Sequence, residues 1–177
     1  LTYIGGYSVN GNGGTATSKG AEWNVSWTPV DGLDFRFGGA YVDAYLTADT
    51  DPILIGAKDG DPLPYVPKWS MSLDGDYHFV ATGDFSPFVG ASWRYVGERY
   101  TSFDASFGQT RYPSYNEFDL RAGLDYKDWT IEVYAKNVTD KRAFSQTFLG
   151  GSAANGGAPV VYIDQPRTIG VTLTAKL

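Results

Sequence analysis

The sequence predicts an all-β chain that crosses a membrane as part of a transmembrane antiparallel up-and-down β-barrel. Apolar and polar residues alternate in seven segments, short and long connections alternate between these segments, and Trp residues lie near the segment ends on the apolar side. Each segment has about ten residues, the length that a tilted strand needs to cross a bilayer.

The alternation is clearest in KWSMSLDGDYHF (68–79), where Trp69 and Leu73 lie on one face and Ser72 and Asp74 on the other. None of the seven segments shows a helical period. The other six segments span residues 19–29, 33–41, 84–96, 116–126, 129–137 and 168–177.

The connections between these segments fall into two classes. The short ones, built from Pro, Asp, Gly and other turn residues, are 29–32, 81–84 and 127–128. The long ones, rich in Gly, Asp, Pro and aromatic residues, are 46–66, 97–115 and 138–164. Short turns on one side of a sheet and long loops on the other are the pattern of an outer-membrane barrel.

Composition narrows the possible classes of protein. The 177 residues fit one domain, and 16% aromatic residues with 22 Gly favour strands and turns. The absence of Cys excludes a disulfide scaffold, a thiolate metal site and a Cys nucleophile. A net charge of -6 argues against nucleic acid as a partner.

A soluble antiparallel sandwich or barrel, with the apolar face as its core, is the alternative fold. Two features favour the membrane barrel. The polar faces are dense rows of Ser, Asp, Glu, Arg and Thr, as a wet lumen requires. Trp27, Trp69, Trp93 and Trp129 lie near strand ends on the apolar face, where an interfacial aromatic girdle would place them.

Seven strands do not close a usual bacterial barrel, because such barrels have an even number of strands, from about 8 upward. Residues 1–8 could form a further strand, but this segment is too short to span. Two open sheet edges in lipid would leave backbone groups unsatisfied, at several kcal/mol each. The chain is therefore expected to be the C-terminal part of a larger barrel.

Five segments in order resemble the C-terminal third of a TonB-dependent outer-membrane receptor. The most specific are the run Lys-Asn-Val-Thr-Asp at 136–140 and Gln-Pro-Arg at 165–167. The matching segments are 17–33, 63–77, 115–126, 129–144 and 165–177. The resemblance implies a barrel of about 22 strands with a plugged lumen. Residues 1–177 would supply the last seven strands, without the plug domain or the N-terminal strands.

The resemblance also implies a function. The expected protein is an outer-membrane active transport receptor, energised by the TonB system, for a scarce nutrient such as a ferric siderophore. Its implied partners are the remainder of the barrel and plug, the TonB energy-coupling complex, the barrel-assembly machinery, lipopolysaccharide and a small-molecule ligand. A soluble all-β carbohydrate- or ligand-binding module and a passive porin wall stay open as alternatives.

The resemblance assigns a role to the alternating C-terminal strand. In such receptors the last strand closes the barrel wall and carries the signal read by the barrel-assembly machinery. The residues implied to form this signal are Gly170, Leu173, Ala175 and Leu177.

The loop at 95–115 is the candidate ligand-binding segment. Arg99, Tyr100, Arg111 and Tyr112 combine bidentate donors with stacking faces, which suit an anionic, aromatic metal chelate. Alternatively, the loop aromatics pack a local core, and the arginines contact lipopolysaccharide phosphates at the rim.

The polar faces offer little for catalysis or a resident metal. Asp74, Asp76 and His78 share one strand face and could bind a metal. Lumen-facing polar residues need no metal, however, so no metal site and no cofactor are predicted. His78 is the single histidine and no G-x-S-x-G motif occurs, so the chain is not expected to be an enzyme.

Overall fold

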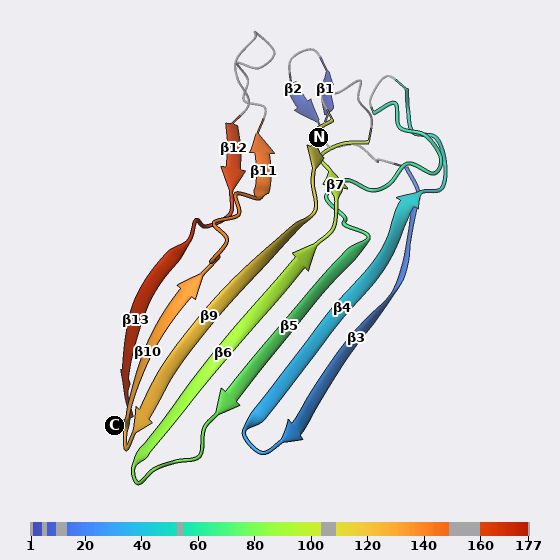
Figure 1. Cartoon of the computed structure of the whole chain (residues 1–177). Helices are drawn as coiled ribbons and strands as arrows, with labels where there is room; N and C mark the ends of the chain where they lie inside the picture. The colour runs from blue at the N-terminus through green and yellow to red at the C-terminus, as the bar shows by residue number, and fades with distance from the viewer. Residues whose placement is uncertain are drawn as a thin grey trace. The chain divides into compact units, whose positions relative to one another are not determined.

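The computed structural model describes residues 2–4, 7–9, 14–52, 55–103, 109–148 and 160–176 (Figure 1). Its largest element is a seven-stranded sheet with strand order β13-β10-β9-β6-β5-β4-β3. These strands are β3 (Ala16–Val30), β4 (Leu33–Leu46), β5 (Trp69–His78), β6 (Phe85–Val96), β9 (Tyr115–Tyr126), β10 (Trp129–Lys136) and β13 (Thr168–Ala175). Each strand pairs with the next strand of this set along the chain, which confirms the predicted up-and-down antiparallel sheet.

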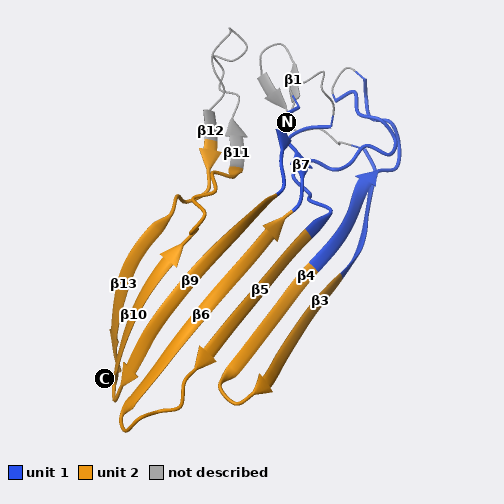
Figure 2. Cartoon of the chain, viewed as in Figure 1, with its two compact units in different colours: residues 1–21, 40–69, 97–114 blue, residues 22–39, 70–96, 115–177 orange. Residues whose placement is uncertain are grey.

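The chain divides into two compact units, shown in Figure 2. Unit 1 contains residues 1–21, 40–69 and 97–114, and unit 2 contains residues 22–39, 70–96 and 115–177. Unit 1 includes most residues of the long connections 46–66 and 97–115. Unit 2 includes most of the sheet, with the strand pairs β5–β6, β6–β9, β9–β10 and β10–β13.

Three short hairpins accompany the main sheet: β1 (Thr2–Ile4) with β2 (Tyr7–Val9), β7 (Arg99–Tyr100) with β8 (Arg111–Tyr112), and β11 (Phe144–Phe148) with β12 (Val160–Ile163). Their strands of two to five residues are too short to show a clear alternation in the sequence. Residues 1–8, expected to hold at most a short strand, contain β1 and part of β2. None of the described residues forms a helix long and apolar enough to cross a membrane.

The predicted short turns join β3 to β4, β5 to β6 and β9 to β10. Gly32, at φ +82°, lies so close to the His78 carbonyl that a Cβ would overlap it. The His78 N–H in turn donates to the Gly32 carbonyl at 2.7 Å. Only glycine adopts this backbone conformation without strain at so close an approach. Lys127, at φ 51°, begins the two-residue turn before β10.

The apolar face of the sheet is exposed. Side chains in the middle of the last strands show this best, since Val133 is 50% and Val171 65% exposed. A soluble sandwich would bury this face as its core, whereas a lipid-facing barrel wall leaves it uncovered by protein. The exposed face therefore supports the membrane barrel over the soluble alternative.

Aromatic residues gather near the strand ends on this face. Trp27 and Trp129 are more than half exposed, and Trp69 is 42% exposed at the first position of β5. Trp93 is half-buried, and its indole N–H donates to Asn116 Oδ1 at 2.9 Å. Apolar rings with satisfied polar atoms are typical of the membrane–water interface.

Candidate functional site

The hairpin β7–β8 in unit 1 brings the four predicted ligand-binding residues together. Arg99 pairs with Tyr112, and Tyr100 pairs with Arg111, across a two-residue ladder. Residues 104–108, between the two strands, lie outside the described residues. The sequence thus selected residues that the fold places side by side, although their binding role stays a prediction.

Glu98, which is not among the residues predicted from the sequence, organises the polar side of this hairpin. Its Oε2 accepts a hydrogen bond from Arg111 Nε at 2.6 Å and forms an ion pair with Arg111 Nη2. Its Oε1 accepts from the Tyr100 hydroxyl at 2.6 Å. No local sequence motif predicts this contact, because it depends on the strand register that places Arg111 opposite Tyr100.

The opposite side of the hairpin is packed. Tyr112 is 1% exposed, with the Arg99 guanidinium 5.3 Å from its ring centroid and the Tyr65 ring edge-on at 6.2 Å. Arg111, by contrast, has a side chain that is 63% exposed. Tyr112 therefore belongs to the local core of the hairpin, while Arg111 and Tyr100 form its polar surface.

The contacts of Glu98 predict a pH dependence for the hairpin. Hydrogen bonds from Arg111 and then Tyr100 lower the pKa of the Glu98 carboxyl below its usual 4.5. The Glu98–Arg111 ion pair is therefore complete above the usual pKa of 4.5 and is lost as pH falls through the lowered pKa. Amide exchange at Tyr100 and Arg111 should be unchanged from pH 7 to pH 5 and accelerate under stronger acid, relative to the intrinsic exchange rate. Glu98→Gln should remove this acid step, and its persistence in that variant would exclude Glu98 as its cause.

In unit 2, Arg121 links three strands on the polar face. Its Nη2 donates to Asp76 Oδ1 at 2.5 Å, and its Nη1 donates to Glu132 Oε2 at 3.3 Å. Gly90 lies between Asp76 and Arg121, and a Cβ there would collide with both side chains. Glycine at this position therefore lets Arg121 on β9 reach across β6 to β5.

Asp76 in this network is one of the three residues that could bind a metal according to the sequence. Asp76 is engaged by Arg121, and the described residues contain no group of three or more His, Cys, Asp or Glu placed to hold a metal ion. A depression of about 290 Å³ beside the network is lined by Ser92, Asp119, Glu132, Tyr134 and Lys136, among others. The polar face is thus an ion-paired, hydrophilic wall.

A double-mutant cycle tests the network. Asp76→Asn and Arg121→Gln are expected to be coupled by about 1 kcal/mol in the free energy of unfolding, because the two side chains are hydrogen-bonded. The control cycle pairs Asp76→Asn with Lys136→Gln, in the neighbouring depression. Additive effects in the first cycle would show that the Arg121–Asp76 contact does not contribute to stability.

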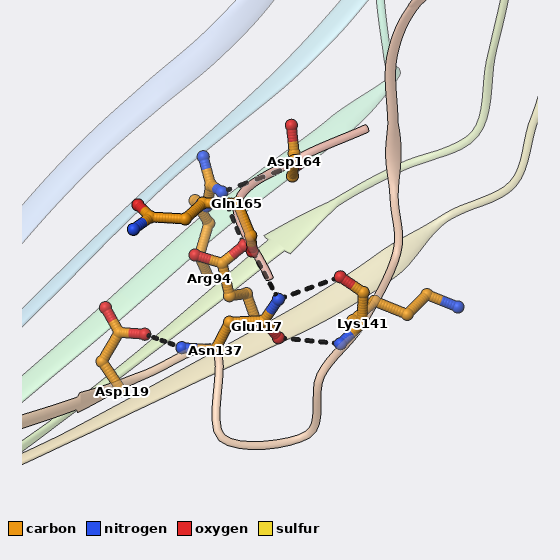
Figure 3. Close-up of polar contacts among 7 residues, drawn as sticks. All are labelled: Arg94, Glu117, Asp119, Asn137, Lys141, Asp164 and Gln165. Atoms are coloured by element: carbon orange, nitrogen blue, oxygen red, sulfur yellow. Dashed lines mark hydrogen bonds and ion pairs between the residues drawn. The ribbon is translucent and has the colours of Figure 1, made fainter. Parts of the chain in front are cut away.

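A third polar group lies where β10 ends, and Figure 3 shows its centre. Asn137 is 2% exposed and has φ 49°, a conformation that Asn tolerates better than most residues. Its Nδ2 donates to the carbonyls of Lys141 at 2.9 Å and Gln165 at 2.8 Å. Its Oδ1 accepts from Lys141 N at 2.8 Å, and its backbone N donates to Asp119 Oδ1 at 2.7 Å.

Asp140 continues the same arrangement. Its Oδ1 accepts from the backbone N of Arg167 at 2.9 Å, and its Oδ2 accepts from Arg142 Nη2 at 3.1 Å. These contacts, the Arg167 N–H first, lower the pKa of the Asp140 carboxyl. We call Asn137, Asp140, Lys141, Gln165 and Arg167 the Asn137 clamp. The two motifs that carry the resemblance, 136–140 and 165–167, thus meet in one hydrogen-bonded structure.

Arg94 lies next to the clamp at the end of β6. Its Nη2 is 2.9 Å from Glu117 Oε2 and 4.0 Å from Asp164 Oδ2, and its guanidinium lies 5.8 Å from the Tyr115 ring centroid. Asp164, the residue before Gln165, therefore lies near this arginine, at the longest distance of an ion pair. Figure 3 shows Arg94, Glu117 and Asp164 around Asn137.

Comparison with known proteins identifies the family. Residues 1–138 match the family described as TonB dependent receptor-like, beta-barrel. The chain belongs to this family. Its members are transport receptors of the outer membrane, so the chain is an outer-membrane protein, as the alternating strands predicted.

The most similar relatives include the metal-pseudopaline receptor CntO from two strains of Pseudomonas aeruginosa, UCBPP-PA14 and PAO1. Each is 30% identical over 162 residues, which cover 91% of this chain and 21% of the receptor. The chain therefore spans about a fifth of the length of these relatives.

Solved structures show the same fold. The ferric yersiniabactin uptake receptor FyuA from Yersinia pestis matches with a TM-score of 0.73 and 21% identity, over 93% of this chain and 24% of that one. The ferric-catecholate import receptor Fiu from E. coli K12 matches with a TM-score of 0.69 and 23% identity, over 90% of this chain and 21% of that one. The seven-stranded sheet thus has the fold of a segment of these barrels.

Proposed function

We propose that this chain is part of an outer-membrane active transport receptor that takes up a ferric siderophore or a related metal chelate. The family match over residues 1–138 carries this proposal. The names of the relatives support the substrate class, because CntO is a metal-pseudopaline receptor and FyuA a ferric yersiniabactin uptake receptor.

In this proposal residues 1–177 supply the last seven strands of a barrel of about 22 strands. The plug and the other strands come from the rest of the receptor, and the TonB complex acts through the plug. The chain itself has neither a cofactor nor an enzymatic activity. It builds the wall and part of the outer surface.

The C-terminal assembly signal is also a proposal. Gly170, Leu173 and Ala175 lie on β13, while Leu177 lies outside the described residues. A Cβ at Gly170 would overlap the ring of Tyr134. Gly170 therefore has a packing reason to be glycine, independent of recognition by the assembly machinery.

Ligand binding is proposed for the polar side of the β7–β8 hairpin, through Arg111 and Tyr100, with Arg99 and Tyr112 supporting it. At neutral pH Glu98 already pairs with Arg111. An anionic group of a chelate must therefore displace Glu98 from the guanidinium, or bind to the donors that remain.

The proposal is tested in cells that carry the full-length receptor. Uptake of a radiolabelled ferric siderophore should require a functional TonB protein. Uptake that persists without TonB would instead indicate a passive porin, and the absence of any iron-chelate uptake or binding across a panel of siderophores would reject this substrate class.

The binding residues are tested on the purified full-length receptor with the siderophore that uptake selects. Arg111→Ala should weaken its binding about tenfold or more, because a hydrogen bond to a charged group contributes roughly 1.5–3 kcal/mol. Lys58→Ala is the control, since Lys58 is an exposed residue of the same unit paired with Asp49. Equal affinities of the two variants would exclude Arg111 as a ligand contact.

A further inference from the structure

The apolar face of the seven main strands carries charge at one place only. On each strand, every second residue lies on the same face as the exposed apolar side chains. At these positions of the seven described strands, the charged residues are Lys19 on β3 and Asp43 on β4. Every other position in step with them is apolar, aromatic, Gly, Pro, Thr or Asn. Charge on a lipid-facing wall is costly in the hydrocarbon and favourable only near the headgroups.

A second lysine joins this pair. Lys68 Nζ is 3.5 Å from Asp43 Oδ1, and the Lys68 side chain is 64% exposed. Lys19 Nζ donates to the Tyr45 hydroxyl at 3.4 Å and lies 5.4 Å from the centroid of that ring. The Tyr41 and Trp69 rings lie beside them, with centroids 4.7 Å apart. We call Lys19, Tyr41, Asp43, Tyr45, Lys68 and Trp69 the rim patch; all belong to unit 1.

The rim patch lies at the long-loop end of the strands. Thr47, just after β4, donates from its backbone N to the Thr15 carbonyl, just before β3, at 3.0 Å. Lys68 directly precedes β5, at the end of the long connection from β4. Long loops of outer-membrane barrels are extracellular, so the rim patch is at the level of the outer-leaflet headgroups.

We infer that the rim patch binds phosphate groups of an outer-leaflet lipid, namely the lipid A part of lipopolysaccharide. Its two lysines and one carboxylate leave an excess of positive charge beside aromatic rings, of which that of Trp69 is exposed. Lysine stems lie along apolar surface while their ammonium groups reach the headgroup level, where Trp and Tyr rings also reside. A free phosphate would use only the ammonium groups, whereas a lipid also covers the rings with its acyl chains.

The rim patch suits this contact better than the loop arginines do. The arginines at or near the loop 95–115 are already engaged: Arg94 is paired with Glu117, Arg111 with Glu98, and the Arg99 guanidinium lies over the Tyr112 ring. Lys19 makes a long hydrogen bond of 3.4 Å to the Tyr45 hydroxyl, and Lys68 Nζ is 3.5 Å from Asp43 Oδ1. The lysines are therefore easier to engage with a new anion.

The test measures lipid A binding to the detergent-purified full-length receptor by native mass spectrometry. Lys19→Gln and Lys68→Gln are each expected to weaken binding about fivefold, as one basic residue near an anionic surface contributes. Lys127→Gln is a close control, because Lys127 Nζ is 3.6 Å from Asp84 and 5.3 Å from the Tyr126 ring centroid, with a side chain 58% exposed. Lys127 lies in the short turn at the other end of the strands, and its variant should bind lipid A normally.

Four outcomes would overturn the inference. One is unchanged binding in the Lys19→Gln/Lys68→Gln double variant, and another is an equal loss in Lys127→Gln. The third uses the unmodified receptor. If it binds dephosphorylated lipid A as tightly as lipid A, phosphate is not recognised. Competition by inorganic phosphate at similar affinity would assign the patch to a free anion and so reject the lipid.

Discussion

Replacing Val133 by arginine is expected to destabilise the full-length receptor in a bilayer by about 2–4 kcal/mol, the cost of arginine near the midplane of a barrel wall. Val133 is half exposed within β10, flanked by Ala122 on β9 and Val171 on β13. Because these neighbours are apolar, the guanidinium would find neither a partner nor water there. Equilibrium unfolding in lipid vesicles measures the change.

Thr172→Arg is the matched control. Thr172 lies on β13 directly opposite Glu132, on the polar face of the same strand pair. There the guanidinium would reach water and a carboxylate, so the expected change is below about 1 kcal/mol. Equal destabilisation by the two variants, or none by Val133→Arg, would show that the apolar face does not meet lipid.

Removing the side chain of Asn137 is expected to cost about 3 kcal/mol in the free energy of unfolding. Asn137→Gly keeps a residue that accepts φ 49° but deletes the bonds to Lys141 and Gln165. The backbone groups left behind would lose their partners, at roughly 1–3 kcal/mol for each buried group. Urea unfolding of the full-length receptor in vesicles should show the loss, with faster exchange of the Lys141 amide.

Lys127→Gly is the control for the effect that a glycine substitution has on the backbone itself. Lys127 has a similar φ of 51°, but its side chain makes only an exposed ion pair with Asp84 and a contact with the Tyr126 ring. Its replacement should change stability by no more than about 0.5 kcal/mol, as at other surface positions. If Asn137→Gly behaves the same way, the clamp contributes nothing to the closure of β13 onto β10.

The sequence by itself determined the seven main strands, their order and the face that meets lipid. A period of two residues is set by strand geometry, and no competing helical period interfered. Strand ends were less well determined. β4 was expected over 33–41 but continues to Leu46, because Ala44 and Leu46 are buried and the Leu63 amide binds the Ala44 carbonyl. This extension depends on a loop that packs back on the strand.

Side-chain partners were decided only by the tertiary structure. The sequence selected Arg111 and Tyr100 but not Glu98, and it singled out both clamp motifs without indicating that they touch. Arg121 reaches Asp76, 45 residues earlier, only because Gly90 on the strand between them has no side chain. Asn137 binds Gln165 across 28 residues. Alternation along one strand determines which face a residue occupies, but the register between strands determines what it meets there.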